Sequence, residues 1–478
     1  MAPTVAVVGG GISGLAACYH LVRAPRPPKV LLLEASGRFG GWLQSTRTPE
    51  GAVFEHGPRG VRPTGVVGAE TLHMVSELGL GGDILPVPRD HPASRKRFLY
   101  SGGSLHCLPS GLGGLLWAVP PFSRALLWAG LRDLVTPAGT DPDESAHAFA
   151  QRRFGPEVAE VAVDSLCRGI FAGDSRTLSV RSCFPGLFRA ERSRGSVLLG
   201  MALGDGGRSP RGPESGLARR ARAERWSQWS LRGGMEGLAR GLVAFLASHG
   251  VELRCSTPLR HLCHRHGRWQ LTLPDEIITA DHVVSAVPAT ALAKALPPEA
   301  ELLARELRHI PAVSVAVVNL QYEGVSLPVT GFGHLVPSSE DPALLGIVYD
   351  SVAFPQHDGA GPPSVRLTVM LGGAWFRQIF GEPAAAAPAL LLQRAQKAAR
   401  DHLGLHGTPS RSIVTVQQDC IPQYTLGHWQ RLERISQFLR EQQLPLSLVG
   451  ASYTGVSVND CIASAKAAVG QLLGSPPD

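Results

Sequence analysis

Residues 4–21 read TVAVVGGGISGLAACYHL, and residues 29–34 read KVLLLE. The first segment joins a short apolar run to a glycine-rich turn, followed by apolar residues at helical spacing. The second segment is typical of another buried strand. The order strand, turn, helix, strand predicts a βαβ unit that opens an α/β domain with a parallel sheet.

The glycines of the turn, Gly9, Gly11 and Gly14, have the spacing of a dinucleotide-binding site. Gly9 permits the tight turn, Gly11 lets the backbone approach a pyrophosphate, and Gly14 lets the helix pack on the strand. The helix N-terminus then offers free N–H groups and a favourable dipole to the phosphates. Glu34 ends the second strand, twenty residues after Gly14, where its carboxylate can accept hydrogen bonds from ribose hydroxyls and disfavours NADP.

Composition and charge narrow the class of protein. Hydrophobic residues make up 44% and charged residues 18% of the 478 residues, which excludes general disorder. Every apolar run is interrupted by a charge or a proline before it reaches the roughly 18 residues of a membrane-spanning helix. The net charge is +7, but the arginines are mostly scattered singly, so we expect no nucleic-acid partner.

Metal and disulfide chemistry are also disfavoured. The eight cysteines form no C-x-x-C pair and no regular framework, so we expect reduced thiols. His261, Cys263, His264 and His266 resemble a metal cluster in the sequence, but on a strand they divide between its two faces. We therefore expect no metal site.

A second set of motifs carries a family resemblance. The doublet Gly40–Gly41 follows the ribose acid, and EHGPRG (55–60) comes soon after it. At this spacing the sequence resembles the flavin amine-oxidase superfamily, although Trp42 stands where that superfamily often has arginine. Further segments resemble the protoporphyrinogen oxidase family of the vertebrate type: RGIFAGD (168–174), WSLRGGME (229–236), GFGHLVPSSEDP (331–342), CIPQYTLGH (420–428) and GASYTGVSVNDCI (450–462).

The resemblance implies a noncovalently bound FAD. Leu259 would contact the adenine, and Ala451 with residues 456–458 would close over the isoalloxazine end, where N–H groups at a helix start can stabilise negative charge. The full set of implied cofactor residues is Gly9, Gly10, Gly11, Ile12, Ser13, Gly14, Glu34, Ala35, Trp42, Gly57, Pro58, Arg59, Gly60, Leu259, Ala451, Val456, Ser457 and Val458.

The resemblance also implies the reaction: FAD-dependent, O₂-reducing, six-electron oxidation of protoporphyrinogen IX to protoporphyrin IX with release of H₂O₂, the penultimate step of haem biosynthesis. Because the flavin supplies the hard chemistry, we assign no acid or base residue and expect the protein to position the tetrapyrrole. Arg97 would bind propionate, and the ring would be held by Phe332, Leu335, Val348 and Met370. Arg168 and Gly169 also lie in a segment that resembles the family, and they rank lower as candidates for substrate binding.

The expected fold class is α/β with an α+β substrate domain. A Rossmann-like FAD-binding domain is expected from the discontinuous segments 1–89, 211–300 and 426–478. Residues 90–210 are expected to form a helical membrane-binding insertion, and residues 301–425 a sheet-containing substrate domain.

Residues 91–132 indicate contact with a lipid surface, because they contain five basic residues and no acid. Their apolar residues include Leu115, Leu116, Trp117, Phe122, Leu126, Leu127 and Trp128. The resemblance implies a homodimer bound peripherally to the mitochondrial inner membrane, on the intermembrane-space side. Because residues 4–34 form the dinucleotide unit itself, we expect no cleavable presequence.

Three other functions fit parts of the pattern. An amine oxidase of the same superfamily generally places a lysine near the flavin, but no lysine occurs between Lys294 and Lys397. A flavin- and porphyrin-binding protein without turnover stays open, because the sequence has no acid–base signature to inspect. A nicotinamide dehydrogenase is disfavoured by the glycine doublet and by the segment 450–462.

Overall fold

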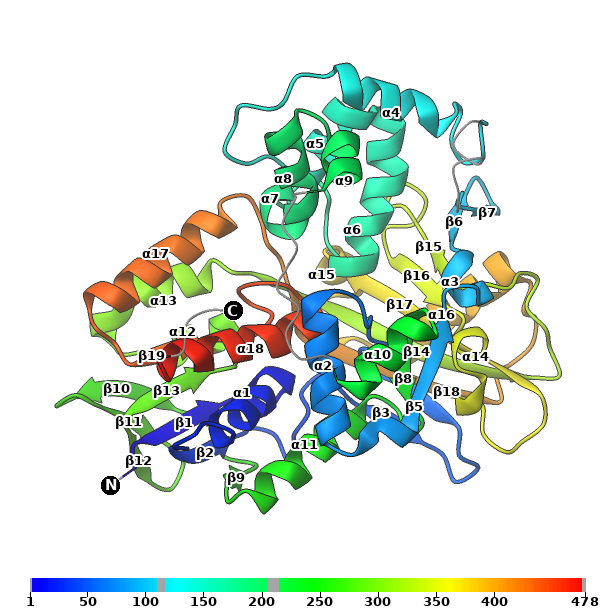
Figure 1. Ribbon diagram of the computed structural model, residues 1–478. Coiled ribbons are helices and arrows are strands. Elements are labelled where there is room, and N and C mark those ends of the chain that lie inside the picture. Colours follow the sequence, from blue (N-terminus) through cyan, green and yellow to red (C-terminus); the bar gives the residue numbers. More distant parts are fainter. Residues whose placement is uncertain (1, 110–116, 205–214, 475–478) are drawn as a thin grey trace.

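The computed structural model describes residues 2–109, 117–204 and 215–474 (Figure 1). Its first layer is a five-stranded parallel sheet, as residues 4–34 predict. The order of its strands is β19 (Leu446–Leu448), β13 (His282–Ser285), β1 (Thr4–Val8), β2 (Lys29–Leu33) and β9 (Glu252–Arg254). These strands come from three separate parts of the chain, so one domain is assembled from discontinuous segments.

Helices and a small sheet bury the two faces of this parallel sheet. One face packs against α1 (Ile12–Val22), α11 (Glu236–Ser248) and α18 (Val458–Leu472). The other face is covered by the three-stranded sheet β10 (His261–Arg265), β11 (Arg268–Thr272) and β12 (Ile277–Ala280), together with α12 (Ala289–Ala295), α13 (Glu301–Arg308) and α17 (His428–Glu441). Coverage of both faces explains why β1 and β2 read as continuous apolar runs.

The second layer is a seven-stranded mixed sheet. Its order is β18 (Arg411–Pro422), β14 (Ala312–Glu323), β17 (Ser364–Gly373), β16 (Leu344–Val348), β15 (Gly333–Leu335), β6 (Phe98–Ser101) and β7 (Ser104–Cys107). Helix α16 (Pro388–Leu403) packs on one face of this sheet. The opposite face carries the residues that concern the candidate site.

Two features of this sheet differ from the sequence-based expectation. Residues 98–107, expected within a mostly helical insertion, form β6 and β7, which extend the sheet through the parallel pairing of β6 with β15. The long edge strand β18 was not expected either; its partner β14 lies about a hundred residues earlier in the chain. Both strands depend on pairing between distant segments, which local periodicity does not report.

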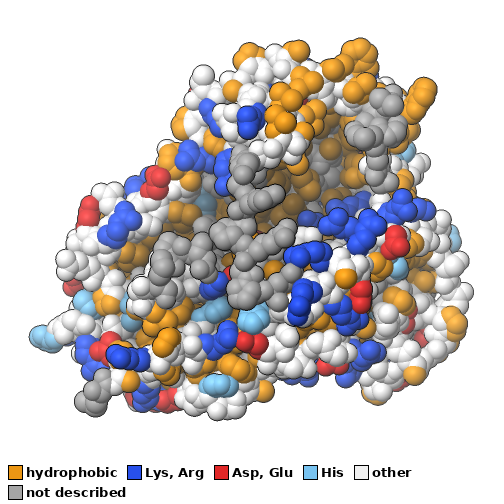
Figure 2. Space-filling view, viewed as in Figure 1, with side chains coloured by type: hydrophobic (Ala, Val, Ile, Leu, Met, Phe, Trp, Pro, Cys, Tyr) orange, Lys and Arg blue, Asp and Glu red, His pale blue; other side chains and the backbone are white. Residues whose placement is uncertain are grey.

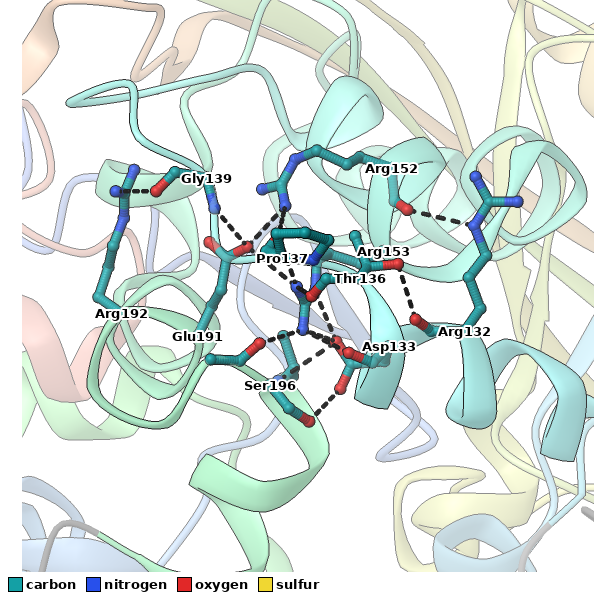
Figure 3. A network of polar contacts seen from close by, with 12 residues as sticks. Arg132, Asp133, Thr136, Pro137, Gly139, Arg152, Arg153, Glu191, Arg192 and Ser196 are labelled. Carbon is teal, nitrogen blue, oxygen red and sulfur yellow. Dashed lines mark hydrogen bonds and ion pairs between the residues drawn. The ribbon is translucent and has the colours of Figure 1, made fainter.

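The helical part of the insertion comprises α4 (Leu126–Val135), α5 (Ala146–Phe154), α6 (Asp164–Phe171), α7 (Val180–Cys183), α8 (Pro185–Arg194) and α9 (Val197–Leu203). Buried ion pairs hold these helices together (Figure 3). The Arg153 guanidinium, fully buried, lies 2.6 Å from an Asp133 carboxylate oxygen and 3.4 Å from Glu191. Asp133 also accepts hydrogen bonds from Ser196 Oγ and the Leu198 N–H, so a single network fixes α4, α5, α8 and α9.

The remaining helices and strands connect these layers. Helices α2 (Gly65–Glu77) and α10 (Gly216–Ala223) pack on the first domain, and β5 (Ile84–Pro88) pairs with β8 (Trp226–Leu231). Strands β3 (Ser45–Arg47) and β4 (Val53–Glu55) form a second antiparallel pair. Among the helices that the structure describes, none is both long enough and apolar enough to cross a membrane.

Candidate functional site

The glycine turn after β1 leaves room for a ligand at one glycine and not at the others. A Cβ on Gly14 would overlap the carbonyl oxygen of Gly9, and a Cβ on Gly9 would lie 2.9 Å from the Ala286 carbonyl carbon. By contrast, a Cβ on Gly11 would find a single neighbour within 4 Å, the Gly41 Cα at 3.9 Å. The missing side chain of Gly11 therefore leaves a cradle, at the place where a pyrophosphate would approach the backbone.

The second glycine turn lies directly beside the first. The Gly40 N–H donates to the Gly10 carbonyl oxygen at 2.8 Å, and Gly40 and Gly41 both have positive φ. Arg38 donates to the carbonyl oxygens of Phe39 and Gly41 and so fixes this turn. The predicted doublet and the predicted fingerprint are thus joined side by side, and a backbone bridge between Gly11 and Gly40 links them.

Glu34 closes the turn from the end of β2. Its carboxylate accepts hydrogen bonds from the Gly10 and Ser36 N–H groups, each at 2.7 Å. Thr257 donates its N–H to the Glu34 carbonyl oxygen, which brings the segment that leads to Leu259 alongside the predicted ribose acid. Ala35 is exposed next to Glu34. The structure therefore brings together the predicted ribose and adenine contacts.

The start of α18 lies near the glycine turn, since Cys461 of this helix contacts Ser13. Ser457 Oγ accepts from the Asp460 N–H, and the Asp460 carboxylate accepts from the Ser457 N–H, which is a complete capping box. Asn459 accepts from Thr71 Oγ1 on α2 at 2.7 Å and donates to the Arg62 carbonyl oxygen at 2.9 Å. The helix start at 456–458 is thereby held against the loop that carries residues 57–62.

The predicted segment 57–60 connects the first domain to the mixed sheet. A Cβ on Gly57 would overlap the Trp42 carbonyl oxygen, and Trp42 itself is 40% exposed. Arg59 forms an ion pair of 2.7 Å with Asp350, whose second oxygen accepts from Thr368 Oγ1 at 2.6 Å. Pro58 and Gly60 flank Arg59 in this loop.

A buried series of hydrogen bonds continues from Thr368. Asn319 on β14 donates to Thr368 Oγ1 at 2.8 Å and to the Glu55 carbonyl oxygen at 3.1 Å, while its own Oδ1 is buried with no hydrogen-bond partner in the structure. The Glu55 carboxyl accepts from the Met235 N–H and from Ser45 Oγ. Burial raises the pKa of Glu55 to about 7, although these hydrogen bonds act to lower it.

Three of the four predicted ring contacts share one face of the mixed sheet. Leu335 on β15 is opposite Gly346 on β16, which is opposite Met370 on β17. Val348 is opposite Thr368, so the apolar residues and the Arg59–Asp350 ion pair lie on the same face. The predicted Phe332 contact precedes β15, where its N–H donates to the Lys96 carbonyl oxygen at 3.0 Å.

Arg97 lies just before β6 and is exposed. Although Arg97 as a whole is exposed, partial desolvation of its guanidinium lowers the pKa of that group, and the positive charge of Arg62 lowers it further. Arg168 differs, because it is buried and donates to the carbonyl oxygens of Val336, Asp341 and Leu344, with its guanidinium 4.7 Å from the Trp375 ring centroid. Arg168 thus fastens α6 to the mixed sheet, and Gly169 packs on Leu335.

The sequence did not identify several residues of this site, namely Arg62, Asn319, Asp350 and Thr368. Asp350 offered a weak signal, since it is an acid directly after the apolar strand 344–348. Thr368 and Asn319 lie inside strands that read as apolar, and only the pairing of β14 with β17 places them together.

Comparison with known proteins agrees with this geometry. The family model of the flavin containing amine oxidoreductases matches residues 12–473. The protoporphyrinogen oxidase of Bos taurus is 60% identical and that of Homo sapiens 59% identical, each over the whole of both chains. A solved structure from Exiguobacterium sp. 255-15 is 24% identical, covers 99% of both chains and has a TM-score of 0.79, which is a likeness of fold.

Proposed function

This chain belongs to the flavin-containing amine oxidoreductase family, and from that premise we propose that it oxidises protoporphyrinogen IX to protoporphyrin IX. The observation that carries the proposal is that Leu335, Val348 and Met370 lie on one face of the mixed sheet, the same face that carries the Arg59–Asp350 ion pair. A flat apolar macrocycle fits such a face, and cations at its rim suit the propionates.

FAD is the cofactor. When bound, it would supply the hydride acceptor for the substrate and the route by which the electrons reach O₂. Gly11, which is open toward its surroundings, would admit the pyrophosphate beside the doublet Gly40–Gly41, and the Glu34 carboxylate would accept hydrogen bonds from the ribose. The N-terminus of α18 provides N–H groups and a positive dipole for the electron-rich ring end. The capping box keeps those N–H groups in place.

The protein's own contribution to the reaction is positioning. The apolar face excludes water and holds the macrocycle at a fixed depth, which converts an encounter into an oriented reaction. In the proposed balance the substrate loses six electrons and six protons over three rounds, and three O₂ become three H₂O₂. An amine oxidase is not favoured, since the strands between Lys294 and Lys397 contain no lysine.

Membrane attachment is part of the proposal. The exposed apolar residues of helices α4 and α9, together with Trp117 before α4, are called the α4–α9 apolar surface. They are Trp117, Leu127, Trp128, Leu131, Leu134, Val135, Leu198, Leu199, Met201 and Leu203. Figure 2 shows hydrophobic side chains gathered over α4. Such a surface is suited to insertion into one leaflet. Phe122 was expected among the lipid-facing residues, but it is buried and does not contribute to this surface. Leu115 and Leu116, also expected there, lie outside the described residues.

The cellular setting is proposed on the family resemblance. We infer a homodimer bound to the mitochondrial inner membrane from its intermembrane-space side. The α4–α9 apolar surface supports only the membrane part of this inference.

The decisive experiment mixes purified holoenzyme with protoporphyrinogen under argon and then admits air. We expect the flavin absorbance to bleach, porphyrin fluorescence to appear, and air to restore the flavin colour with formation of H₂O₂. Putrescine or another amine should leave the absorbance unchanged. Bound flavin that never bleaches with the porphyrinogen would instead identify a binding protein without turnover.

A further inference from the structure

Two exposed arginines lie at the rim of the candidate site. Arg62 follows the flavin loop and Arg97 precedes β6, and both are exposed. Within the part of the chain that the structure describes, neither guanidinium has a hydrogen bond or an ion pair. Their neighbours are different, because Arg59 is paired with Asp350 and Arg38 is bonded to carbonyl oxygens.

The backbone of each arginine is held in place. Val61 exchanges two hydrogen bonds with Trp229, at 2.8 and 2.9 Å, and the Arg62 carbonyl oxygen accepts from Asn459. The Arg97 carbonyl oxygen accepts from the Leu108 N–H at 2.8 Å. Both positions are therefore preorganised, which lowers the entropic cost of binding a ligand.

The two segments lie beside one buried cluster, although they are distant in the sequence. A Cβ on Gly60 would lie 3.6 Å from the Phe354 ring, and Phe354 belongs to the same buried cluster as Ala93 on α3 (Pro92–Arg95). The charge of Arg62 also reaches Arg97, where it lowers the pKa of that guanidinium after the larger effect of burial. Figure 2 shows a row of Lys and Arg side chains below the helical part, beside a recess.

Two like charges that influence each other repel, so an anion that contacts both would stabilise each. A guanidinium binds a carboxylate through two parallel hydrogen bonds, and a pair of guanidinium groups fits a pair of carboxylates. The propionates of protoporphyrinogen IX lie on one edge of the macrocycle, and its vinyl groups lie elsewhere on the ring.

We propose that Arg62 and Arg97 together bind the two carboxylates of the substrate's propionate edge, with Arg62 as a second anchor and specificity-determining residue. This inference rests on the proposed function. Binding by the two arginines would orient the macrocycle, because the carboxylate edge stays at the rim while the apolar part of the ring lies toward Leu335 and Met370.

The test compares Arg62→Gln, Arg97→Gln and the double variant with the control Arg95→Gln. Arg95 is an exposed cation on α3, two residues from Arg97, and tests whether general charge attraction suffices. Initial rates are measured with protoporphyrinogen and with its dimethyl ester, which lacks both negative charges. Protoporphyrin binding is measured separately, by fluorescence titration of each variant.

For the diacid we expect KM and the porphyrin dissociation constant to rise about tenfold in each single variant, with kcat within about twofold. The double variant should lose more than either single variant, and Arg62→Lys should recover part of the loss. With the dimethyl ester, wild type and variants should have similar KM values, because the ester gives the arginines no charge to bind. Arg95→Gln should resemble wild type.

Either of two results would overturn the inference. Arg62→Gln could leave KM and porphyrin binding unchanged while Arg97→Gln weakens both, or Arg95→Gln could weaken them as much as Arg62→Gln. Failure of the proposed function is a separate result, namely no turnover of any porphyrinogen by wild type. In that case the binding titration with diacid and ester still decides whether the two arginines bind carboxylates.

Discussion

Gly14 packs so closely on the carbonyl oxygen of Gly9 that any side chain at position 14 would overlap it. Gly11, three residues earlier, faces open space apart from the Gly41 Cα at 3.9 Å. The two glycines of one motif therefore serve different purposes: Gly14 is needed by the fold, and Gly11 by the ligand.

This difference predicts opposite outcomes for Gly11→Val and Gly14→Val. We expect Gly11→Val to give a folded protein that retains little or no flavin, because the new side chain fills the place of the pyrophosphate. Gly14→Val should instead yield little folded protein, since helix α1 can no longer pack on β1. The measurements are circular dichroism, thermal unfolding and the ratio of flavin to protein. A fully yellow Gly11→Val protein would refute the assigned pyrophosphate site.

The Glu55 carboxyl predicts a pH dependence of stability. Its pKa is raised from 4.5 to about 7 by burial, so the folded protein holds this proton more tightly than the unfolded chain does. Stability from this group is therefore present below pH 4.5 and declines as the pH rises toward 7, by a total of about 3 kcal/mol.

Replacement by an uncharged isostere tests this slope. In Glu55→Gln, the amide can still accept from the Met235 N–H, and no proton has to be lost on raising the pH. We expect the melting temperature of Glu55→Gln relative to wild type to increase between pH 5 and pH 8. Other titrating groups affect both proteins equally, so parallel melting curves at all pH values would contradict the assigned cause.

The sequence predicted the parts of the fold that depend on local pattern. The run from Thr4 to Glu34 is a continuous βαβ unit, and its strand order, turn and helix follow from short-range periodicity and glycine positions. Strands β6 and β18 were not predicted in the mixed sheet, because their partners lie far away in the chain. Register between distant strands is set by tertiary packing.

The same limit applies to the candidate site. Arg97, Leu335 and Met370 came from a family resemblance, and the sheet register explains why Leu335 and Met370 lie on one face. Asn319 and Thr368 had no signal, because a polar residue within an apolar strand does not show in the sequence which buried partner satisfies it. The pairing of β14 with β17 in the folded protein places Asn319 within hydrogen-bond distance of Thr368.

The contact between Gly169 and Leu335 predicts a substrate effect without loss of the fold. A Cβ on Gly169 would lie 2.9 Å from both terminal methyl carbons of Leu335, which is a flexible side chain that can move aside. We expect Gly169→Ala to keep its flavin and its melting temperature within a few degrees, while KM for the porphyrinogen rises several-fold. Adding Leu335→Val removes the clash and should recover part of the KM. An unchanged KM in Gly169→Ala would separate Leu335 from the substrate.

The α4–α9 apolar surface predicts the site of lipid contact. Trp128→Glu and Met201→Glu, at positions that are 63% and 65% exposed, should reduce sedimentation with anionic vesicles, because each places a charge where an apolar side chain inserts. Turnover in detergent should be unchanged. Ile277→Glu is a matched control, since Ile277 is also 63% exposed but lies on β12 of the first domain. Equal loss with the control would contradict a localised surface.

The buried Arg153 connects the integrity of the helical part to that surface, because its network fixes α4 and α9 (Figure 3). Arg153→Met leaves Asp133 and Glu191 buried without this cation, and we expect it to destabilise the helical part by about 3–5 kcal/mol. Hydrogen exchange should report faster opening of α4 and α9, whereas α1 and the flavin content stay unchanged.

A pair of further variants separates lost charge pairing from lost packing. Arg152→Met is the milder comparison, because Arg152 is 29% exposed and Glu191, one of its two partners, keeps its ion pair with Arg153. The double variant Asp133→Leu with Arg153→Met removes both members of the central pair and should regain part of the lost protection, since most of the cost comes from an uncompensated buried charge. If the double variant opens as fast as Arg153→Met, the helices are held by the shape of the arginine and not by its charge.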